Sequence, residues 1–398
     1  MKYIILLSDG MAGKPLAELN GQTTMAAART PNMDRLAKDA DMGLVHMVPK
    51  KMEPGSDTAN LAVMGYDPQK YYTGRSPLEA LSIGVDMAKD DVSLRMNLVT
   101  LSEKESYEEK FILDHSAGEI TTAEAAVLVE DLKEELQKAG YEFFVGTAYR
   151  HLVIVKNGQV LPLTPPHDIL GKRIGDFLPK DEVLKDFMMR SYDILKDHPI
   201  NRKRREKGLR EANSIWFWGA GTKPLLDNFY EKTGKKGIMI SAVDLLKGLA
   251  IGTGMDLGIV ENATGGLHTN YEGKANKAYE ALMKKDYDFA YIHIEAPDEM
   301  GHQGLVKEKI QAIEKIDEKV LGTLCQQLDE EKVAYRILIL PDHPTPIVDR
   351  THTSDAVPFL LYDSTKKQKE NAGFSEKEAE KTGWLIEDGY TLLDVLLK

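Results

Sequence analysis

The sequence has little of what marks secreted and membrane proteins. Cys325 is the only cysteine among 398 residues, so no disulfide can form within the chain, and a reducing compartment is expected. No apolar run approaches the roughly 20 residues that a membrane-spanning helix needs. The apolar run at residues 3–7 ends at Ser8 and is too short for the core of a signal peptide. These absences predict a cytoplasmic protein that does not bind membranes.

Positive charge is also scarce. Lys and Arg number 51 and Asp and Glu number 63, so the formal net charge is −12, and the pI is about 5.4. Nonspecific binding to DNA or RNA relies on cationic side chains that neutralise phosphates, so no nucleic-acid partner is expected. The remaining composition, 42% hydrophobic and 29% charged, is typical of globular proteins and argues against disorder. At about 150 residues per domain, the length predicts roughly two to three domains.

Short apolar runs alternate with longer amphipathic stretches, which is the pattern of strands alternating with helices. We expect strands at residues 3–7, 237–242, 289–294, 335–340 and 357–362, and helices at 31–37, 243–250 and 306–328. In the last of these helices Ile310, Ile313 and Ile316 recur on one face. The alternation predicts an α/β fold, with a mostly parallel sheet covered by helices on both faces.

The middle of the chain has a different pattern. Strands are expected at residues 92–101, 106–112 and 141–155, around a helix at 122–138 that Gly140 stops. We therefore expect a smaller α+β domain at residues 91–210, inserted into a core formed by residues 1–90 and 211–398. The basic run at 202–205 in the insert is expected to be a solvated helix face. His115 gives no functional signal.

Acidic and histidine side chains stand where the expected strands end. Asp9 follows the first strand, Asp298 and His302 follow 289–294, Asp342 and His343 follow 335–340, and His352 precedes 357–362. Because the carboxyl ends of parallel strands meet at one edge, these six side chains are expected to lie close together. Each of them taken alone could instead cap a helix or a turn. Taken together they favour a metal site, and six ligands suit two divalent ions such as Mn²⁺, Zn²⁺ or Mg²⁺.

Ser56 stands at a turn into an expected helix, in the segment 53–60. Near a helix N-terminus its oxygen would lie beside free backbone N–H groups, which favour anions. Metal coordination would lower the pKa of the Ser56 hydroxyl and make it a nucleophile. Alternatively, Ser56 is only a helix N-cap, with Asp57 in the first turn. The local sequence taken alone favours the cap.

Seven short motifs follow one another along nearly the whole chain. They are Ser8-Asp9-Gly10, Pro54-Gly55-Ser56-Asp57-Thr58-Ala59, Gly65-Tyr66-Asp67-Pro68, Tyr72-Thr73-Gly74-Arg75, Asp298-Glu299-Met300-Gly301-His302, Pro341-Asp342-His343 and Thr351-His352-Thr353. In these motifs the chain resembles the archaeal type of cofactor-independent phosphoglycerate mutase, a family of the alkaline phosphatase superfamily. The resemblance implies an alkaline phosphatase-like fold and two divalent ions, with Mn²⁺ as the first expectation. Asp298, His302 and His352 would hold one ion, and Asp9, Ser56, Asp342 and His343 the other.

The resemblance also implies a glycolytic isomerase that interconverts 3- and 2-phosphoglycerate through a phosphoserine intermediate. Ser56 would carry the phosphoryl group. Lys247 resembles the family lysine at the phosphate site, although a solvated helix lysine is an alternative. Arg150 and His167, in the inserted domain, resemble residues that contact the small phosphorylated substrate, although surface positions are an alternative.

Two positions depart from the family pattern. Asn60 stands where many mutases have a histidine, and His268-Thr269-Asn270 stands where the family has Asp-Thr-Asn. These changes resemble a bacterial subgroup proposed to act as homoserine kinase, so this kinase, or another metal-dependent phosphotransferase, is the alternative function. A kinase needs a nucleotide site. The chain has no Gly-x-x-x-x-Gly-Lys-Ser/Thr loop, although other kinds of nucleotide site exist.

Overall fold

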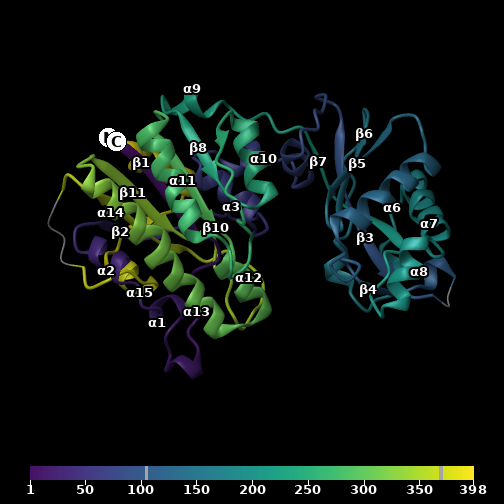
Figure 1. Cartoon of the computed structure of the whole chain (residues 1–398), viewed down its shortest axis with the longest axis horizontal. Coiled ribbons are helices and arrows are strands. Elements are labelled where there is room, and N and C mark those ends of the chain that lie inside the picture. The colour runs from purple at the N-terminus through teal and green to yellow at the C-terminus, as the bar shows by residue number, and fades with distance from the viewer. Residues whose placement is uncertain (104–105, 367–370) are drawn as a thin grey trace. The chain divides into compact units, whose positions relative to one another are not determined.

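The computed structural model describes residues 1–103, 106–366 and 371–398. The chain divides into two compact units (Figure 1). The core unit comprises Met1–Tyr72 and Leu225–Lys398, and the inserted unit comprises Thr73–Pro224. The core unit therefore contains both ends of the chain.

A sheet of eight strands forms the centre of the core unit within the described residues. The strands are β1 (Lys2–Ser8), β2 (Asp41–Val45), β8 (Gly237–Ile240), β9 (Asp256–Leu257), β10 (Phe289–Ile294), β11 (Tyr335–Leu340), β12 (Val357–Asp363) and β13 (Leu385–Ile386). Their order is β13-β2-β12-β11-β1-β10-β8-β9. β1 is paired in parallel with both β10 and β11, whereas β12 runs antiparallel to β11 and to β2. The expected α/β fold with a mostly parallel sheet is confirmed.

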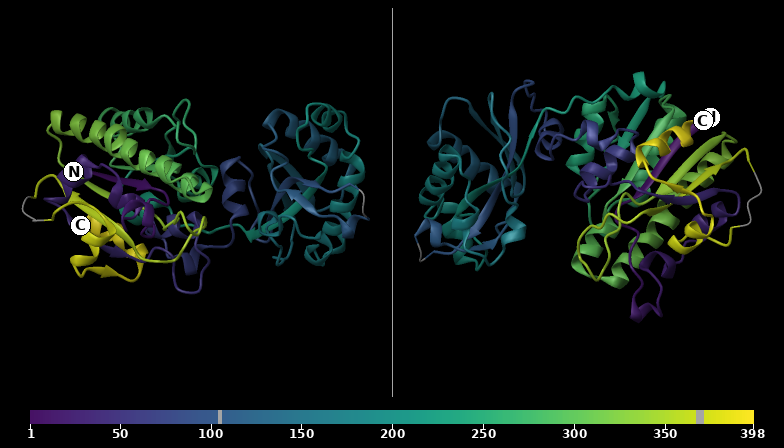
Figure 2. Two further views of the ribbon diagram at one scale, coloured as in Figure 1. Left: turned by 90° about the horizontal axis from the view of Figure 1, so that it is seen from below. Right: turned by 180° about the vertical axis from the view of Figure 1, so that it is seen from behind.

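Helices cover both faces of this sheet (Figure 2). The helices of the core unit are α1 (Thr24–Ala27), α2 (Pro31–Ala37), α3 (Ser56–Val63), α4 (Pro68–Tyr71), α9 (Phe229–Thr233), α10 (Asp244–Thr253), α11 (Tyr271–Lys284), α12 (Ala296–Gln303), α13 (Val306–Lys315), α14 (Thr323–Glu330), α15 (Glu376–Lys381) and α16 (Leu392–Leu397). Side chains alternate along a strand, and Ile4, Ala290 and Ile292 pack under α2, α11, α13 and α14. Tyr291 points the opposite way, and its hydroxyl reaches Asn60 of α3. Helix α3 therefore lies on the face of β10 opposite to α2, α11, α13 and α14.

The helix expected at 306–328 is interrupted by a π-helical segment, Ile316–Gly322, between α13 and α14. The buried Asp317 lies in this segment and accepts hydrogen bonds from the backbone N–H groups of Asn32 (3.1 Å) and Met33 (2.7 Å). The N-cap of α2, Thr30, makes no side-chain cap bond in the described structure. A carboxylate from a distant segment thus caps α2.

The inserted unit contains a second, antiparallel sheet. Its strands are β3 (Val92–Leu101), β4 (Ile112–Asp114), β5 (Tyr141–Thr147), β6 (Arg150–Val155) and β7 (Ser214–Thr222), and its helices are α5 (Ser76–Ser82), α6 (Thr122–Glu135), α7 (Glu182–Leu195) and α8 (Pro199–Glu206). The structural division differs from the expected boundaries at 91 and 210. β7 pairs with β3 from Val92 to Val99, and α5 packs on both strands, so these two elements belong to the insert.

Three local predictions in the insert are wrong. The strand expected at 106–112 contains a 3-10 turn at Tyr107–Glu109, and β4 begins only at Ile112. α6 ends at Glu135, before the stop expected at Gly140. In the basic run, Arg204 is buried rather than solvated, because its guanidinium donates to Glu124 and to the backbone oxygens of Ala117 and Arg210.

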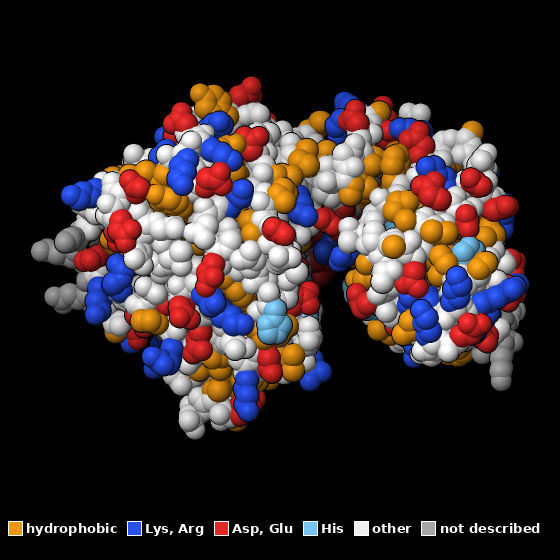
Figure 3. All heavy atoms as spheres, viewed as in Figure 1, with side chains coloured by type: hydrophobic (Ala, Val, Ile, Leu, Met, Phe, Trp, Pro, Cys, Tyr) orange, Lys and Arg blue, Asp and Glu red, His pale blue; other side chains and the backbone are white. Residues whose placement is uncertain are grey.

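The surface carries both signs of charge. On the face that Figure 3 shows, acidic and basic side chains are interspersed. Among the described residues, no helix combines the length and the apolar character that crossing a membrane would require.

Replacing Asp317 by alanine should destabilise the core unit by about 1–3 kcal/mol, because two N–H groups of α2 lose their acceptor. Urea unfolding followed by circular dichroism measures this change. The matched control is Glu318→Ala, which alters the exposed neighbour and should change stability by less than about 0.5 kcal/mol. Equal stability of the two variants would contradict the capping role.

Candidate metal centre

The candidate ligands meet at one edge of the core sheet. Asp9 follows the carboxyl end of β1, α12 with Asp298 follows β10, and Asp342 follows β11. β12 is antiparallel to β11, so its first residues lie at this same edge and bring in His352, which precedes β12. The edge was expected from parallel strands alone. His352 reaches it for a different reason, the reversed direction of β12.

Asp298, His302 and His352 form one cluster. Asp298 and His302 are four residues apart on α12, so they share a helix face. The His302 and His352 Nε2 atoms are 2.9 Å apart, and they lie 3.2 and 3.4 Å from the Asp298 carboxylate oxygens. The Nδ1 atoms of the two rings face the backbone oxygens of Arg350 (3.0 Å) and Pro54 (3.4 Å). This arrangement directs both Nε2 atoms toward Asp298, as in histidines that bind metals.

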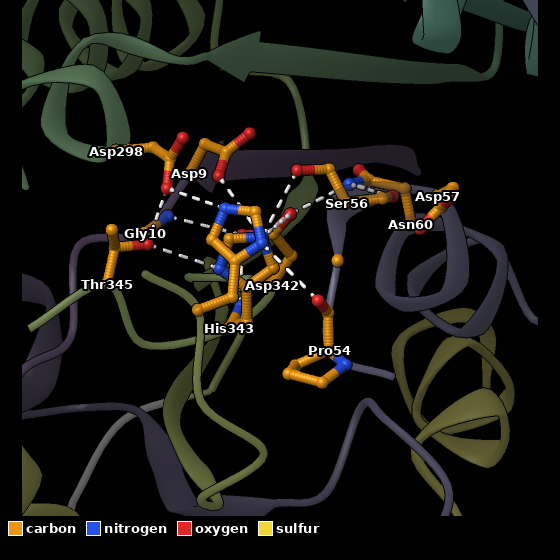
Figure 4. A network of polar contacts seen from close by, with 12 residues as sticks. Asp9, Gly10, Pro54, Ser56, Asp57, Asn60, Asp298, Asp342, His343 and Thr345 are labelled. Carbon is orange, nitrogen blue, oxygen red and sulfur yellow. Dashed lines mark hydrogen bonds and ion pairs between the residues drawn. The ribbon is translucent and has the colours of Figure 1, made fainter. Parts of the chain in front are cut away.

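Asp9, Ser56, Asp342 and His343 form the second cluster. The Nε2 atom of His343 lies 3.1 Å from Ser56 Oγ, 3.4 Å from Asp342 Oδ2 and 3.7 Å from Asp9 Oδ1. In Figure 4, Asp9 and Asp298 lie on one side of this group of side chains and Ser56 lies on the other.

The structure shows that Ser56 is not the N-cap of α3. The N-cap of α3 is Gly55, and Ser56 is the first helical residue. Its hydroxyl faces His343 at 3.1 Å. The interpretation of Ser56 as an N-cap is therefore wrong. At this position the oxygen also lies beside the positive end of the α3 dipole.

The burial of the three carboxylates tests whether a cation fits here. Asp9, Asp298 and Asp342 are 1%, 5% and 0% exposed. Burial, followed by the charges of Asp342 and Asp298, raises the pKa of Asp9 well above its usual range. The buried Asp9 Oδ1 has no hydrogen-bond partner among the described residues. Such a concentration of desolvated acid is stabilised by a cation, so the residues fit divalent metal ions.

The histidines modify the charges at the centre. Burial opposes ionisation of Asp298, yet hydrogen bonds from His302 and His352 hold its pKa well below the usual range. Burial would lower the pKa of His302, but the hydrogen bond to Asp298 raises it to about 9. Burial lowers the pKa of His343. The two clusters therefore differ: the pKa of His302 beside Asp298 is raised, whereas the pKa of His343 beside Asp9 and Asp342 is lowered.

Sequence reasoning missed the residues that support these ligands. His293 of β10 is fully buried; its Nε2 donates to Asp9 Oδ2 (2.9 Å), while its Nδ1 accepts from Ser241 Oγ (3.1 Å). Burial lowers the pKa of His293 to about 3, so the ring is neutral. Thr345 donates to Asp298. The sequence offered one sign of His293, a histidine inside the otherwise apolar run 289–294. It offered no sign of the role of Thr345.

Gly10 is needed for close approach at the centre. Its φ is +60°, and a Cβ there would lie 2.5 Å from Thr345 Oγ1 and 2.7 Å from Asp298 Oδ1. Its N–H donates to Asp342 Oδ1 at 3.2 Å. A side chain at this position would displace the ligands.

Within the described part of the chain, Lys247 makes no hydrogen bond or ion pair with either cluster. It lies on α10, which packs against α3, and its Nζ donates to Asp244 Oδ1 at 3.0 Å, one turn earlier on the helix. The structure thus brings the helix of Lys247 beside the helix of Ser56. A phosphate contact of Lys247 stays a prediction.

Arg150 and His167 belong to a cationic and aromatic cluster in the inserted unit. Ring contacts link Arg150 to Tyr149, Tyr149 to His115, His115 to His167, and His167 to Trp218. The buried Arg95 guanidinium lies 4.5 Å from the Trp218 ring. Burial lowers the pKa of His167, and the charge of Arg95 lowers it further. His115 and Arg95 had no signal in the sequence, because only folding places them here.

Comparisons with known proteins agree with these features. The family model described as 2,3-bisphosphoglycerate-independent phosphoglycerate mutase matches residues 37–201. A probable enzyme of this name from Geobacter sulfurreducens is 45% identical over 402 residues, covering 100% of both chains. The enzyme of this name from Methanosarcina mazei is 43% identical over 404 residues, again covering 100% of both chains.

Solved structures extend the likeness to three dimensions. The PH0037 protein from Pyrococcus horikoshii superposes with a TM-score of 0.82 at 31% identity, covering 100% of this chain and 96% of that one. The cofactor-independent phosphoglycerate mutase from Thermoplasma acidophilum has a TM-score of 0.64 at 26% identity, with 100% and 99% covered. These relatives give no support to a homoserine kinase. On the evidence of full-length identities of 43% and 45%, the chain belongs to the 2,3-bisphosphoglycerate-independent phosphoglycerate mutase family.

Proposed function

We propose that this protein interconverts 3- and 2-phosphoglycerate through a phosphoserine on Ser56, with no need for 2,3-bisphosphoglycerate. The observation that carries the proposal is the Ser56 hydroxyl, 3.1 Å from His343 at the edge of a buried carboxylate and histidine cluster. A binding protein would have no use for a nucleophile in this position. The full-length relatives named as mutases support the choice of substrate.

Two divalent ions are part of the proposal. Asp298, His302 and His352 would hold one ion, and Asp9, Ser56, Asp342 and His343 the other. Mn²⁺ is the first choice, with Zn²⁺ and Mg²⁺ as alternatives. Bound there, the ions would supply Lewis-acid stabilisation of phosphoryl charge and a lower pKa for the Ser56 hydroxyl.

The groups of the chain have defined tasks in the reaction. Ser56 Oγ attacks the phosphorus of 3-phosphoglycerate, and the bond from phosphorus to the C3 oxygen breaks. Glycerate stays bound until its C2 oxygen attacks the same phosphorus and Ser56 Oγ leaves. The free backbone N–H groups in the first turn of α3 would stabilise the anionic oxygens of the phosphoryl group during transfer. Lys247, on the adjacent helix, would neutralise the phosphoryl charge.

The cluster around Arg150 and His167 would hold the anionic substrate. Arginine pairs with carboxylate and phosphate oxygens through two parallel hydrogen bonds. Arg95, beside Trp218, adds a buried guanidinium to this cluster, where it pairs with Glu79 at 3.3 Å. We propose that the protein acts in glycolysis in the cytoplasm on this small phosphorylated substrate, with neither nucleic acid nor membrane as partner.

Ser56→Ala should abolish formation of 2-phosphoglycerate, because the variant has no oxygen to carry the phosphoryl group. Phosphorus NMR of the protein with Mn²⁺ and 3-phosphoglycerate measures turnover, and intact mass shows a phosphorylated form only for the wild type. Ser82→Ala, a change at the last residue of α5, is the control and should retain wild-type turnover. Turnover by Ser56→Ala would exclude the phosphoserine route.

Removal of metal with EDTA should abolish turnover, and added Mn²⁺ should restore it.

Asp9→Asn should weaken Mn²⁺ binding on the order of 100-fold, because the buried site loses a negative ligand. Calorimetric titration of the metal-free protein measures this affinity. The control is Asp349→Asn, at a partly exposed acid that pairs with Lys14, and its affinity should equal that of the wild type. Undiminished binding by Asp9→Asn would contradict the proposed ligand set.

Arg150→Ala should raise KM for 3-phosphoglycerate by roughly 10-fold or more, because a charged hydrogen bond to the substrate is lost. Mn²⁺ affinity should not change. Steady-state kinetics and metal titration together separate the two effects. The exposed Arg202 of the same unit provides the control, Arg202→Ala, for which KM should stay at the wild-type value. An unchanged KM for Arg150→Ala would remove Arg150 from the substrate site.

A further inference from the structure

A buried amide connects the nucleophile to a candidate metal ligand. Asn60 lies one turn after Ser56 on α3 and is 0% exposed. Its Nδ2 lies 2.9 Å from the Ser56 backbone oxygen and 2.9 Å from Asp342 Oδ2. The side-chain nitrogen of Asn60 therefore links the backbone of Ser56 to the carboxylate of Asp342 (Figure 4).

The orientation of this amide follows from its neighbours. The Ser56 carbonyl and the Asp342 carboxylate can only accept hydrogen bonds, so the NH₂ group of Asn60 must face them. Asn60 Oδ1 then faces the Tyr291 hydroxyl at 2.6 Å, and the hydroxyl must donate. Tyr291 is 0% exposed. Burial, together with the charges of Asp342 and Asp9, raises its pKa well above the usual range, so it keeps the proton that it donates.

The Asp342 carboxylate is held on both oxygens. Oδ1 accepts from the backbone N–H groups of Gly10 (3.2 Å) and His343 (3.0 Å), and Oδ2 accepts from Asn60. The backbone donors are fixed by the chain. Asn60 is the side-chain donor, and its direction depends on Tyr291. Loss of the tyrosine oxygen would leave a buried Asn60 Oδ1 without this donor, and the amide would lose one of the hydrogen bonds that fix its orientation.

We infer that Tyr291 is a positioning residue, which acts through Asn60 to fix the Asp342 carboxylate relative to Ser56 and so sets divalent-metal affinity and the rate of phosphoryl transfer. The effect on the rate of phosphoryl transfer rests on the proposed function. The effect on divalent-metal affinity rests on the geometry of the candidate ligands. Among the described residues, the hydroxyl of Tyr291 makes its hydrogen bond to the amide of Asn60.

The test is Tyr291→Phe, which removes one oxygen and keeps the ring. Mn²⁺ affinity of the metal-free protein, measured by calorimetry, should fall about 10–100-fold, as for other partners of metal ligands. The kcat should fall while KM for 3-phosphoglycerate stays constant. The matched control is Tyr335→Phe on β11, an equally buried tyrosine whose hydroxyl donates to Asp329 (3.1 Å). It should lose stability without loss of Mn²⁺ affinity.

A double-mutant cycle tests the route through the amide. If Tyr291 acts through Asn60, Tyr291→Phe should cause little further loss of affinity in an Asn60→Ala protein. Additive losses would overturn the route. A Tyr291→Phe protein with lower thermal stability and wild-type Mn²⁺ affinity would overturn the inference and show a purely structural hydroxyl. Should Tyr291→Phe not fold, wild-type Mn²⁺ affinity in folded Asn60→Ala would overturn the inference as well.

The same measurements distinguish failure of the proposed mutase reaction from failure of the positioning role of Tyr291. A wild-type protein that binds Mn²⁺ without mutase turnover, together with a Tyr291→Phe variant that binds Mn²⁺ weakly, would reject the reaction and support the positioning role. Normal turnover and normal Mn²⁺ affinity in Tyr291→Phe would reject the positioning role and leave the reaction intact.

Discussion

The repulsion among three buried carboxylates is the constraint on which the site depends. Asp9, Asp298 and Asp342 are almost without solvent, and each needs positive charge or hydrogen-bond donors to stay ionised. The fold supplies donors from the backbone, from neutral His293 and from Asn60. Cations would supply the rest. The net charge of the whole chain has little bearing on this balance, because the relevant acids are buried.

Rigid elements give these acids their positions. Every candidate ligand follows or precedes a strand of the core sheet or lies on one of the short helices α3 and α12. Neutral side chains then fix the direction of individual oxygens: His293 holds one oxygen of Asp9, and Thr345 holds one of Asp298. Neutral donors suit this task because they orient a carboxylate without cancelling the charge that attracts a metal.

The sequence predicts most of the core fold and the meeting of the candidate ligands at one edge of the sheet. Strands such as β10 and β11 are runs of apolar residues long enough to be read directly, and acids at their ends follow from the geometry of parallel sheets. Asn60 stood out in the sequence only as a departure from the family pattern, and Tyr291 and Arg95 could not be found in this way. Their partners are distant in sequence, so only tertiary packing gives these residues their roles. The limits of the insert were missed for a related reason, since the membership of β7 depends on its pairing with β3.

The position of β1 also determines when the centre can form. β1 is synthesised first, yet its two neighbours, β10 and β11, are encoded near the other end of the chain. The insert, Thr73–Pro224, is continuous and contains the partners of its own strands. On the ribosome the insert can therefore complete its sheet while β1 still lacks both neighbours. The core acquires five of its seven candidate ligands only when the last third of the polypeptide has emerged.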